Sequence, residues 1–175
     1  MKSVLISINK PHTDNIKALI KKVEIRKNKP NCELPFKCFI YETKNKGGCA
    51  KVIGEFICDE IYHIKNYDTR FSINNDERLT NGVARASCLN FDDMKKYLKD
   101  KDGYAWHITD LVIYDKPREL WEFYHKCEKM PCEGCEHLKY QRVNANEYDF
   151  DCEYLNGKIP FQRPPQSWAY CELGV

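Results

Sequence analysis

Short apolar or alternating runs separated by polar turns dominate the chain. A run rich in β-branched residues covers residues 3–8 and ends at a turn-like Asn9-Lys10-Pro11, and apolar and charged residues alternate from Val23 to Arg26. Alternation with a period of two is typical of half-buried strands. Further strand-like runs cover residues 36–43, 52–64 and 104–114, with a last one at the end of the chain. The pattern predicts a domain whose core is mainly β-sheet.

Three short segments favour helices beside this sheet. Apolar residues recur at helical spacing between Pro11 and Lys22. Asn90 precedes acidic residues at the start of a segment that runs to Leu98, as an N-cap would. Residues 117–123 begin with a proline, which the first turn of a helix tolerates. We expect three short helices flanking the strands.

Composition indicates one ordinary folded domain. The 175 residues are 42% hydrophobic and 31% charged, which suits a single core and argues against global disorder. We expect a soluble cytoplasmic protein with no membrane partner, because the sequence has no long apolar run and its beginning does not resemble a signal peptide. The net charge of +2 is too small to predict general attraction to phosphate. Residues 65–86 are polar and nearly aperiodic, which predicts a loop insertion.

A cysteine-rich segment over residues 125–153 predicts a second insertion. It contains one Cys-x-x-Cys pair with a glycine inside it and another cysteine five positions earlier, a spacing that suits a tetrahedral zinc site. His125 and His137 are alternatives for the fourth ligand, and unpaired thiols or a redox pair are the alternative to a metal. The set predicted to hold one structural zinc is Cys127, Cys132, Cys135 and Cys152.

Four short pieces, in this order along the chain, carry a resemblance to a known family. They are Ser7-Ile8-x-x-Pro11, Lys21-x-x-Glu24-x-Arg26, Trp106-His107-Ile108-Thr109-Asp110 and Pro164-Pro165-Gln166-Ser167-Trp168-Ala169-Tyr170. Together they resemble ASCH-domain proteins of the PUA-like superfamily. The resemblance implies one α+β domain over residues 1–175, a PUA-like β-barrel of the ASCH type with a few short flanking helices and the Cys-rich insertion.

The resemblance also implies a class of function. ASCH-domain proteins are associated with RNA binding and with coactivator or translation-related roles, and some small members hydrolyse acylated cytidine nucleosides. Those hydrolases resemble a Gly-x-Lys-Thr-x-Thr-x-Arg pattern, in which Lys21 matches the lysine and Glu24 replaces the presumed nucleophilic threonine. A carboxylate can act as a general base or hold the edge of a base, but it cannot serve as an activated hydroxyl.

The leading candidate site is therefore Lys21, Glu24 and Arg26, at the helix-to-strand junction that lines the cleft in PUA-like folds. Lysine and arginine contact phosphate, while glutamate accepts hydrogen bonds from the exocyclic amine of a base. The same three residues could instead form a solvated charged edge, which is worth less than about 1 kcal/mol.

Aromatic side chains near the predicted strand ends complete the candidate site. Tyr104, Trp106 and His107 are candidates to contact a nucleic acid, because single-stranded bases stack on aromatic rings for about 1 to 3 kcal/mol each. Trp168 and Tyr170 are further aromatics of this kind, although aromatic residues in strands are more often core residues. His107 is also a candidate acid or base near neutral pH.

Three functions follow as hypotheses. The first is binding of RNA, another single-stranded nucleic acid or a nucleotide in the cleft of Lys21, Glu24 and Arg26. The second is an amidohydrolase- or ribonuclease-like hydrolase acting on nucleosides or RNA, with Lys21 and Glu24 as catalytic residues. The third is a protein-interaction adaptor that uses the Cys-rich insertion. The sequence lacks the glycine-rich and nucleophile motifs of nucleotide triphosphatases, dinucleotide enzymes and serine hydrolases.

Overall fold

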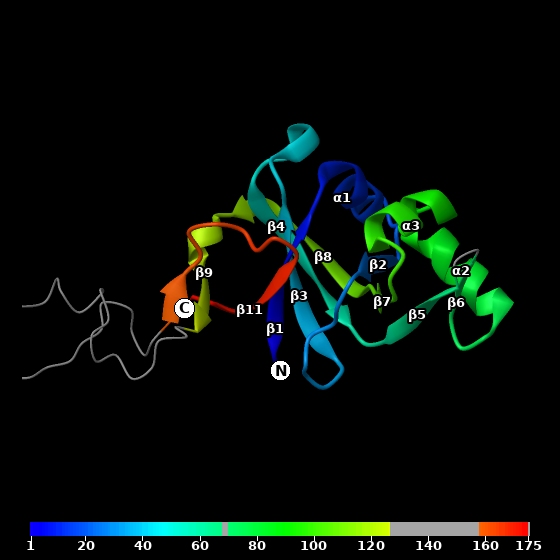
Figure 1. Ribbon diagram of the computed structural model, residues 1–175. Coiled ribbons are helices and arrows are strands. Elements are labelled where there is room, and N and C mark those ends of the chain that lie inside the picture. Colours follow the sequence, from blue (N-terminus) through cyan, green and yellow to red (C-terminus); the bar gives the residue numbers. More distant parts are fainter. Residues whose placement is uncertain (68–69, 127–157, 175) are drawn as a thin grey trace, which may run out of the picture.

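The computed structural model describes residues 1–67, 70–126 and 158–174, and its strands lie in two sheets (Figure 1). The seven-stranded sheet has the order β10 (Lys158–Pro160), β9 (Phe123–Lys126), β11 (Trp168–Leu173), β1 (Ser3–Ile8), β3 (Phe36–Glu42), β4 (Lys51–Cys58) and β8 (Thr109–Arg118). The four-stranded sheet has the order β2 (Val23–Arg26), β7 (Gly103–His107), β5 (Ile61–Tyr67) and β6 (Arg70–Ser72).

Strand β1 lies at the middle of the larger sheet. It pairs in parallel with β3, Val4 opposite Cys38, and antiparallel with β11, Val4 opposite Tyr170. The two strands that flank β1, β3 and β11, therefore come from parts of the sequence that are far apart. Burial on both faces explains why residues 4–6 are an unbroken apolar run.

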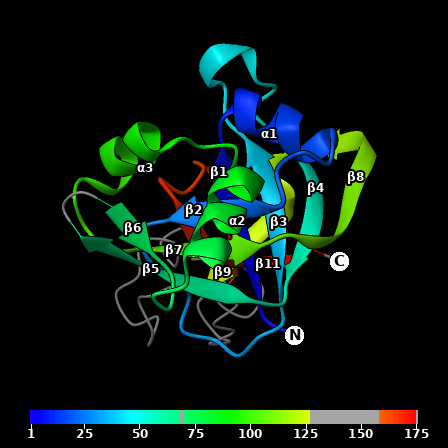
Figure 2. The same ribbon diagram turned by 90° about the vertical axis from the view of Figure 1, so that its right-hand side faces the viewer.

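In the described ranges, three helices and two short 3-10 turns flank the strands. The helices are α1 (Lys10–Lys17), α2 (Glu77–Ser87) and α3 (Phe91–Leu98), and the 3-10 turns are η1 (Asn45–Gly47) and η2 (Leu120–Glu122). The side chains of Asp76 and Asn90 accept the cap hydrogen bonds of α2 and α3. Both helices lie beside the four-stranded sheet, while α1 lies next to the end of β1 (Figures 1 and 2). No helix in the described ranges has the length and apolar character needed to cross a membrane.

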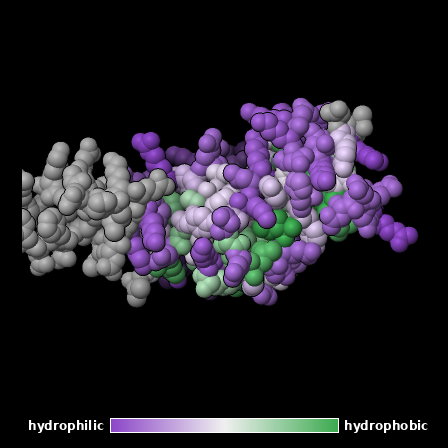
Figure 3. All heavy atoms as spheres, turned by 60° about the horizontal axis from the view of Figure 1, so that its bottom comes forward, coloured by the Kyte–Doolittle hydropathy of each residue, from purple (hydrophilic) through white to green (hydrophobic). Residues whose placement is uncertain are grey.

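The described part of the chain has a core of three apolar clusters. One, with Ile6, Ile40 and Trp106, includes buried side chains of both sheets. The second joins the four-stranded sheet to α2 and α3 through side chains such as Val83, and the third, with Phe123, lies on the other face of the seven-stranded sheet. The outer surface seen in Figure 3 is mainly hydrophilic, with apolar atoms exposed near its middle.

The structure confirms a mixed α+β fold rich in sheet and corrects the prediction of a barrel. Among the described strands no closed barrel is found: β8 pairs only with β4, β10 only with β9, and β2 only with β7. The two sheets pack against each other through the shared apolar cluster instead. The expectation of a β-barrel followed from the family resemblance, and sequence patterns do not encode sheet closure.

The predicted loop over residues 65–86 is also wrong. The end of β5, strand β6 and nearly all of α2 occupy its described residues. The side chain of Asp76 accepts a hydrogen bond from the Leu79 N–H, and Leu79 and Val83 on one face of α2 pack on the sheet. Its few apolar residues, such as Leu79 and Val83 four positions apart, are easily overlooked in a mainly polar sequence.

One predicted helix is shorter than expected, and another is replaced by a strand end and a 3-10 turn. Helix α1 ends at Lys17, because Leu19 adopts a left-handed φ of 59° and the backbone then turns into β2. In place of a helix over residues 117–123, β8 continues to Arg118 and only the η2 turn follows. Pro117 is compatible with this position because an edge strand does not need every N–H.

Candidate functional site

Strand β2 places the candidate side chains on one face of the four-stranded sheet. Glu24 lies opposite Trp106 and Arg26 opposite Tyr104 in the antiparallel pairing with β7. Alternate residues of a strand share a face, so these four side chains point to the same side. Trp106 and Tyr104 pack with the cluster between the two sheets. The charged residues of β2 therefore face the interior rather than solvent.

Lys21, Glu24 and Arg26 form a buried ionic triad. Lys21 Nζ lies 3.3 Å from Glu24 Oε2, and Arg26 Nη2 lies 3.1 Å from Glu24 Oε1. The three residues are only 2%, 8% and 5% exposed. This excludes the alternative of a solvated charged edge. Two cations and one carboxylate give the cluster a net charge of +1. Keeping this charge buried, away from water, costs free energy.

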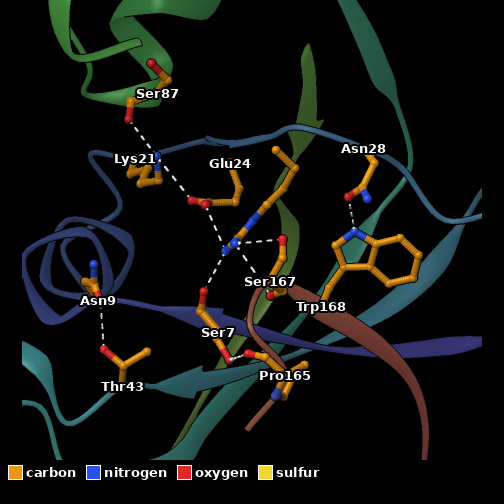
Figure 4. Close-up of polar contacts among 11 residues, drawn as sticks. Ser7, Asn9, Lys21, Glu24, Asn28, Thr43, Ser87, Pro165, Ser167 and Trp168 are labelled. Carbon is orange, nitrogen blue, oxygen red and sulfur yellow. Dashed lines mark hydrogen bonds and ion pairs between the residues drawn. The ribbon is translucent and has the colours of Figure 1, made fainter. Parts of the chain in front are cut away.

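Backbone carbonyls from three parts of the chain hold the two cations. Lys21 Nζ donates to the Ser87 carbonyl at 2.6 Å, and Arg26 Nη2 donates to the Ser7 carbonyl at 2.8 Å. Arg26 Nη1 is 3.4 Å from Ser167 Oγ and 3.5 Å from the Ser167 carbonyl. Figure 4 shows Lys21 between Ser87 and Glu24, with Ser7 and Ser167 on the other side of Glu24. The end of α2, strand β1 and the segment before β11 thus meet at the triad.

The triad is not fully hydrogen-bonded. Glu24 Oε2 and Arg26 Nε are buried and have no hydrogen-bond partner within the described residues. Burial raises the pKa of Glu24, but the charges of Lys21 and Arg26 outweigh this effect and hold the pKa below its ordinary value. The carboxylate is therefore ionised at neutral pH. Glu24 Oε2 is thus held only by its ion pair with Lys21, and Arg26 Nε is a buried donor without an acceptor in the described residues.

His12 and Tyr97 lie near the triad. Burial lowers the pKa of His12 on α1, the charge of Lys21 lowers it further, and Glu24 acts in the opposite direction. Burial raises the pKa of Tyr97 on α3, and the charge of Arg26 opposes that rise. A neutral imidazole and a neutral phenol therefore flank the charged cluster at neutral pH.

Two hollows in the surface lie on either side of the triad. The first, of about 220 Å³, is lined by Leu19, Lys21, Lys22, Ile108, Thr109, Asp110 and Leu111. The second, of about 820 Å³, includes Pro165 and Trp168. These two residues flank Ser167, whose oxygen atoms contact Arg26. Lys21 thus lines the smaller hollow, and the segment whose Ser167 contacts Arg26 borders the larger one.

The three aromatic candidates have different positions. Trp106 is fully buried and packs edge-on against Phe36, with a ring distance of 5.5 Å. It belongs to the core, so the expectation that it stacks on a base is corrected. Tyr104 is half-buried beside Arg26 and stacks on His63 at 5.3 Å, so it remains a candidate contact.

His107 is not part of the triad. It lies opposite Val23 in the sheet, one position out of phase with Glu24, so its side chain points to the other face. Its Nδ1 atom is 2.7 Å from a carboxylate oxygen of Asp59, at the turn between β4 and β5. His107 thus lies apart from the triad and pairs with Asp59, and its predicted nucleic-acid contact and acid–base role stay predictions.

The predicted zinc ligands lie outside the described residues. This applies to Cys127, Cys132, Cys135, Cys152 and the alternative ligand His137. Of the candidates, His125 alone is described; it lies in β9 with its ring 4.9 Å from that of Phe161. Zinc binding by this segment remains a prediction.

Sequence reasoning missed the carbonyl groups that position the triad. Ser87 and Ser167 act through the backbone, and a backbone carbonyl leaves no signal in residue type. His12 was missed as well, because it lies on a helix whose sequence gives no hint that it faces β2. The Pro165-Gln166-Ser167-Trp168 piece was noticed for the family resemblance, and its contact with Arg26 gives a physical reason for it.

Comparison with known proteins indicates a shared fold. No protein-family model and no curated protein matches the sequence. Among solved structures, the chain is similar to the ASCH protein from Zymomonas mobilis, with 20% identity and a TM-score of 0.58 over 97% of this chain and 87% of that one. It is similar to a tyrosine-to-phenylalanine mutant of that protein at 19% identity and a TM-score of 0.58, over 97% of this chain and 90% of the mutant. At this level of identity the likeness establishes the fold.

Proposed function

We propose, from the ASCH fold that this chain shares with the Zymomonas mobilis protein, that the chain binds RNA or a nucleotide at the triad of Lys21, Glu24 and Arg26. One observation carries the proposal. The triad is buried and has one net positive charge; among the described residues Glu24 Oε2 has only its 3.3 Å ion pair with Lys21, and Arg26 Nε has no hydrogen-bond partner.

The chemistry of these groups suits a nucleotide. A phosphate or another anionic group balances the excess positive charge, and counterion release makes such binding sensitive to salt. Glu24 Oε2 can accept a hydrogen bond from the exocyclic amine of a base, and Arg26 Nε can donate to a neighbouring ring nitrogen or carbonyl. Tyr104, half-buried beside Arg26, can support the base by stacking.

Fluorescence anisotropy tests the proposal on the full chain. The probes are single-stranded RNA of about 12 nucleotides, the matching DNA and duplexes, each at two salt concentrations, with the four nucleoside monophosphates as competitors. The key variant is Lys21→Met, which removes the excess charge, and the matched control is Lys116→Met at an exposed position of β8. We expect salt-sensitive binding that Lys21→Met weakens at least about tenfold and Lys116→Met does not. Equal binding by wild type and Lys21→Met would refute the proposal.

A second candidate function is hydrolysis of a nucleoside or of RNA. The observation that favours it is His12, whose lowered pKa leaves a neutral imidazole close to Lys21 and Glu24. A neutral imidazole can accept a proton in such a reaction. The test is product formation from acylated nucleosides and from single-stranded RNA, compared between wild type, His12→Gln and Lys21→Met. Turnover that survives in both variants would remove this candidate.

The adaptor hypothesis concerns residues 125–153, most of which lie outside the described ranges. It is tested separately by metal analysis of the purified chain. Zinc in the wild type that is lost in a Cys132→Ser/Cys135→Ser variant is the expected result. Equal zinc content in the two proteins would contradict the predicted ligand set.

A further inference from the structure

The larger of the two hollows is a groove lined in part by residues of β9 and β11, strands that lie at the opposite end of the molecule from α2 (Figure 1). Its volume is about 820 Å³, which is within the usual range of ligand-binding clefts. Its described lining residues come from β9, β10 and β11 and from the segment that joins the last two. They are His125, Lys126, Ile159, Pro160, Phe161, Gln162, Arg163, Pro165, Trp168, Ala169 and Tyr170.

Aromatic rings lie along the wall of this groove. Tyr170 is 41% exposed, and its ring meets that of Trp168 edge-on at 5.5 Å. Trp168 is fixed in turn by a hydrogen bond of 2.9 Å from Nε1 to Asn28 Oδ1. An exposed ring held in place by a fixed neighbour is a suitable platform for a nucleobase, because every base has a face that can stack.

The charge of the groove is positive. Lys126 and Arg163 are exposed and have no ion pair within the described parts of the chain, and no Asp or Glu is among the described lining residues. Lys2 adds a further cation, 5.9 Å from the centre of the Tyr170 ring. Glu172, which lies on β11 with Tyr170, forms an ion pair with Lys158. The cations are thus available to an anionic ligand.

The groove and the triad share one short segment of the chain. Pro165 and Trp168 line the groove, and Ser167 between them contacts Arg26. Ser7 Oγ donates to the Pro165 carbonyl at 2.6 Å, which ties the same segment to β1. A polymer with one unit at the triad would therefore run along this segment into the groove.

We propose that this groove binds the continuation of a single-stranded nucleic acid whose neighbouring nucleotide occupies the triad. This inference rests on the proposed function and narrows it from a free nucleotide to a polymer. Stacked bases would use the Tyr170 and Trp168 rings, and phosphates would lie near Arg163 and Lys126. A peptide partner is less favoured, because unpaired cations between exposed rings match the alternating phosphates and bases of a single strand.

Matched variants of the full chain test the groove. Tyr170→Ala is compared with Tyr67→Ala, because both tyrosines are 41% exposed, and Arg163→Ala is compared with Arg78→Ala on the distant helix α2 (Figure 1). We expect Tyr170→Ala to weaken binding of single-stranded RNA of about 12 nucleotides by about tenfold, and Tyr170→Phe to restore it. Arg163→Ala should reduce the slope of log affinity against log salt by about 0.7. Neither control should change binding, and circular dichroism checks that each variant folds.

Mononucleotide binding separates the two proposals. The expected result is that Tyr170→Ala and Arg163→Ala leave mononucleotide affinity unchanged. Lys21→Met should lower the affinity for both RNA and the mononucleotide. If RNA binds no more tightly than a mononucleotide and the groove variants have no effect, this inference is overturned and the proposed function stands. If neither ligand binds, or Lys21→Met affects neither, the proposed function itself fails.

Discussion

Two buried glutamates, Glu24 on β2 and Glu42 at the end of β3, have very different surroundings. Glu42 Oε1 accepts hydrogen bonds from the Thr13 hydroxyl at 2.7 Å and from Lys17 Nζ at 2.9 Å, and Oε2 accepts from the Cys49 N–H at 2.9 Å. Both of its oxygens are satisfied. Glu24 has two cations within 3.3 Å but keeps one oxygen without a hydrogen bond within the described residues.

The difference separates a structural carboxylate from one suited to a ligand. Glu42 joins α1 to β3, and one cation, Lys17, balances its charge. A ligand at Glu42 would therefore find neither an excess charge nor an unused hydrogen-bonding group. The Glu24 cluster has an extra positive charge and unused hydrogen-bonding groups. Buried ion clusters with such features are poor sources of stability, and under the proposed function a nucleotide would complete the Glu24 cluster.

The largest expected effect is on folding and comes from Glu24→Gln. Removing this negative charge leaves Lys21 and Arg26 buried with no counter-charge between them, which should lower the free energy of unfolding by about 3–5 kcal/mol. Urea unfolding at neutral pH measures it, with exposed Glu33→Gln as the control. A loss below about 1 kcal/mol would mean that solvent already screens the triad.

A slightly smaller, pH-dependent effect is expected at Glu42. Burial raises the pKa of this carboxyl, but hydrogen bonds from Thr13, Lys17 and Cys49 lower it to about 2. The folded protein therefore holds this proton less tightly than the unfolded chain, whose glutamate has a pKa of about 4.3. The stabilisation, about 3 kcal/mol, is present above that value and is lost as the pH falls towards 2.

The variant Glu42→Gln should remove this part of the pH dependence. The expected result is a loss of about 3 kcal/mol at pH 7 that shrinks as the pH is lowered. Unfolding curves for the two proteins at several pH values provide the measurement. Parallel pH profiles for wild type and Glu42→Gln would show that Glu42 is not the titrating group.

Lys21→Met should have little effect on stability while weakening ligand binding. It removes the excess charge and leaves the Glu24–Arg26 pair, so the change in unfolding free energy should stay within about 1 kcal/mol. Lys17→Met, beside Glu42, is the matched control and should keep full nucleotide affinity. A Lys21→Met protein that fails to fold would indicate that the 2.6 Å bond to the Ser87 carbonyl is the main role of this lysine.

The smallest expected change is in the titration of His12. Burial lowers its pKa first and Lys21 lowers it further, so Lys21→Met should raise the pKa of His12. Nuclear magnetic resonance of the imidazole protons across the pH range measures the shift. No change in the pKa would mean that the imidazole is too far from the lysine to take part in chemistry with it.

The sequence allowed the strands and the triad residues to be predicted better than the connections. Val23 to Arg26 alternates clearly, so strand β2 and the shared side of Glu24 and Arg26 were predictable. Burial of that side was not, because charged residues on one face of a strand ordinarily indicate solvent. Helix α2 was missed, since a few apolar residues such as Val83 support it in a polar sequence.

The long-range parts of the site were beyond sequence reasoning. Trp106 was a candidate for stacking because aromatic residues look alike in sequence whether they lie in the core or at a surface, and the sheet packing decides the matter. The contacts of Arg26 with Ser7 and Ser167 depend on β11 lying beside β1. Residue type and spacing contain no information about such a pairing.

The pairing of β1 with β11 also has a consequence for the order of events during synthesis. Strand β1 is synthesised well before its antiparallel neighbour β11, and Ser167 follows Arg26 by 141 positions. Contacts between such distant residues form slowly, because a long stretch of chain must be ordered before they can form. A nascent chain would therefore carry Arg26 without its Ser167 contacts, and we expect the triad to be complete only once Ser167 has been synthesised and has folded beside β1.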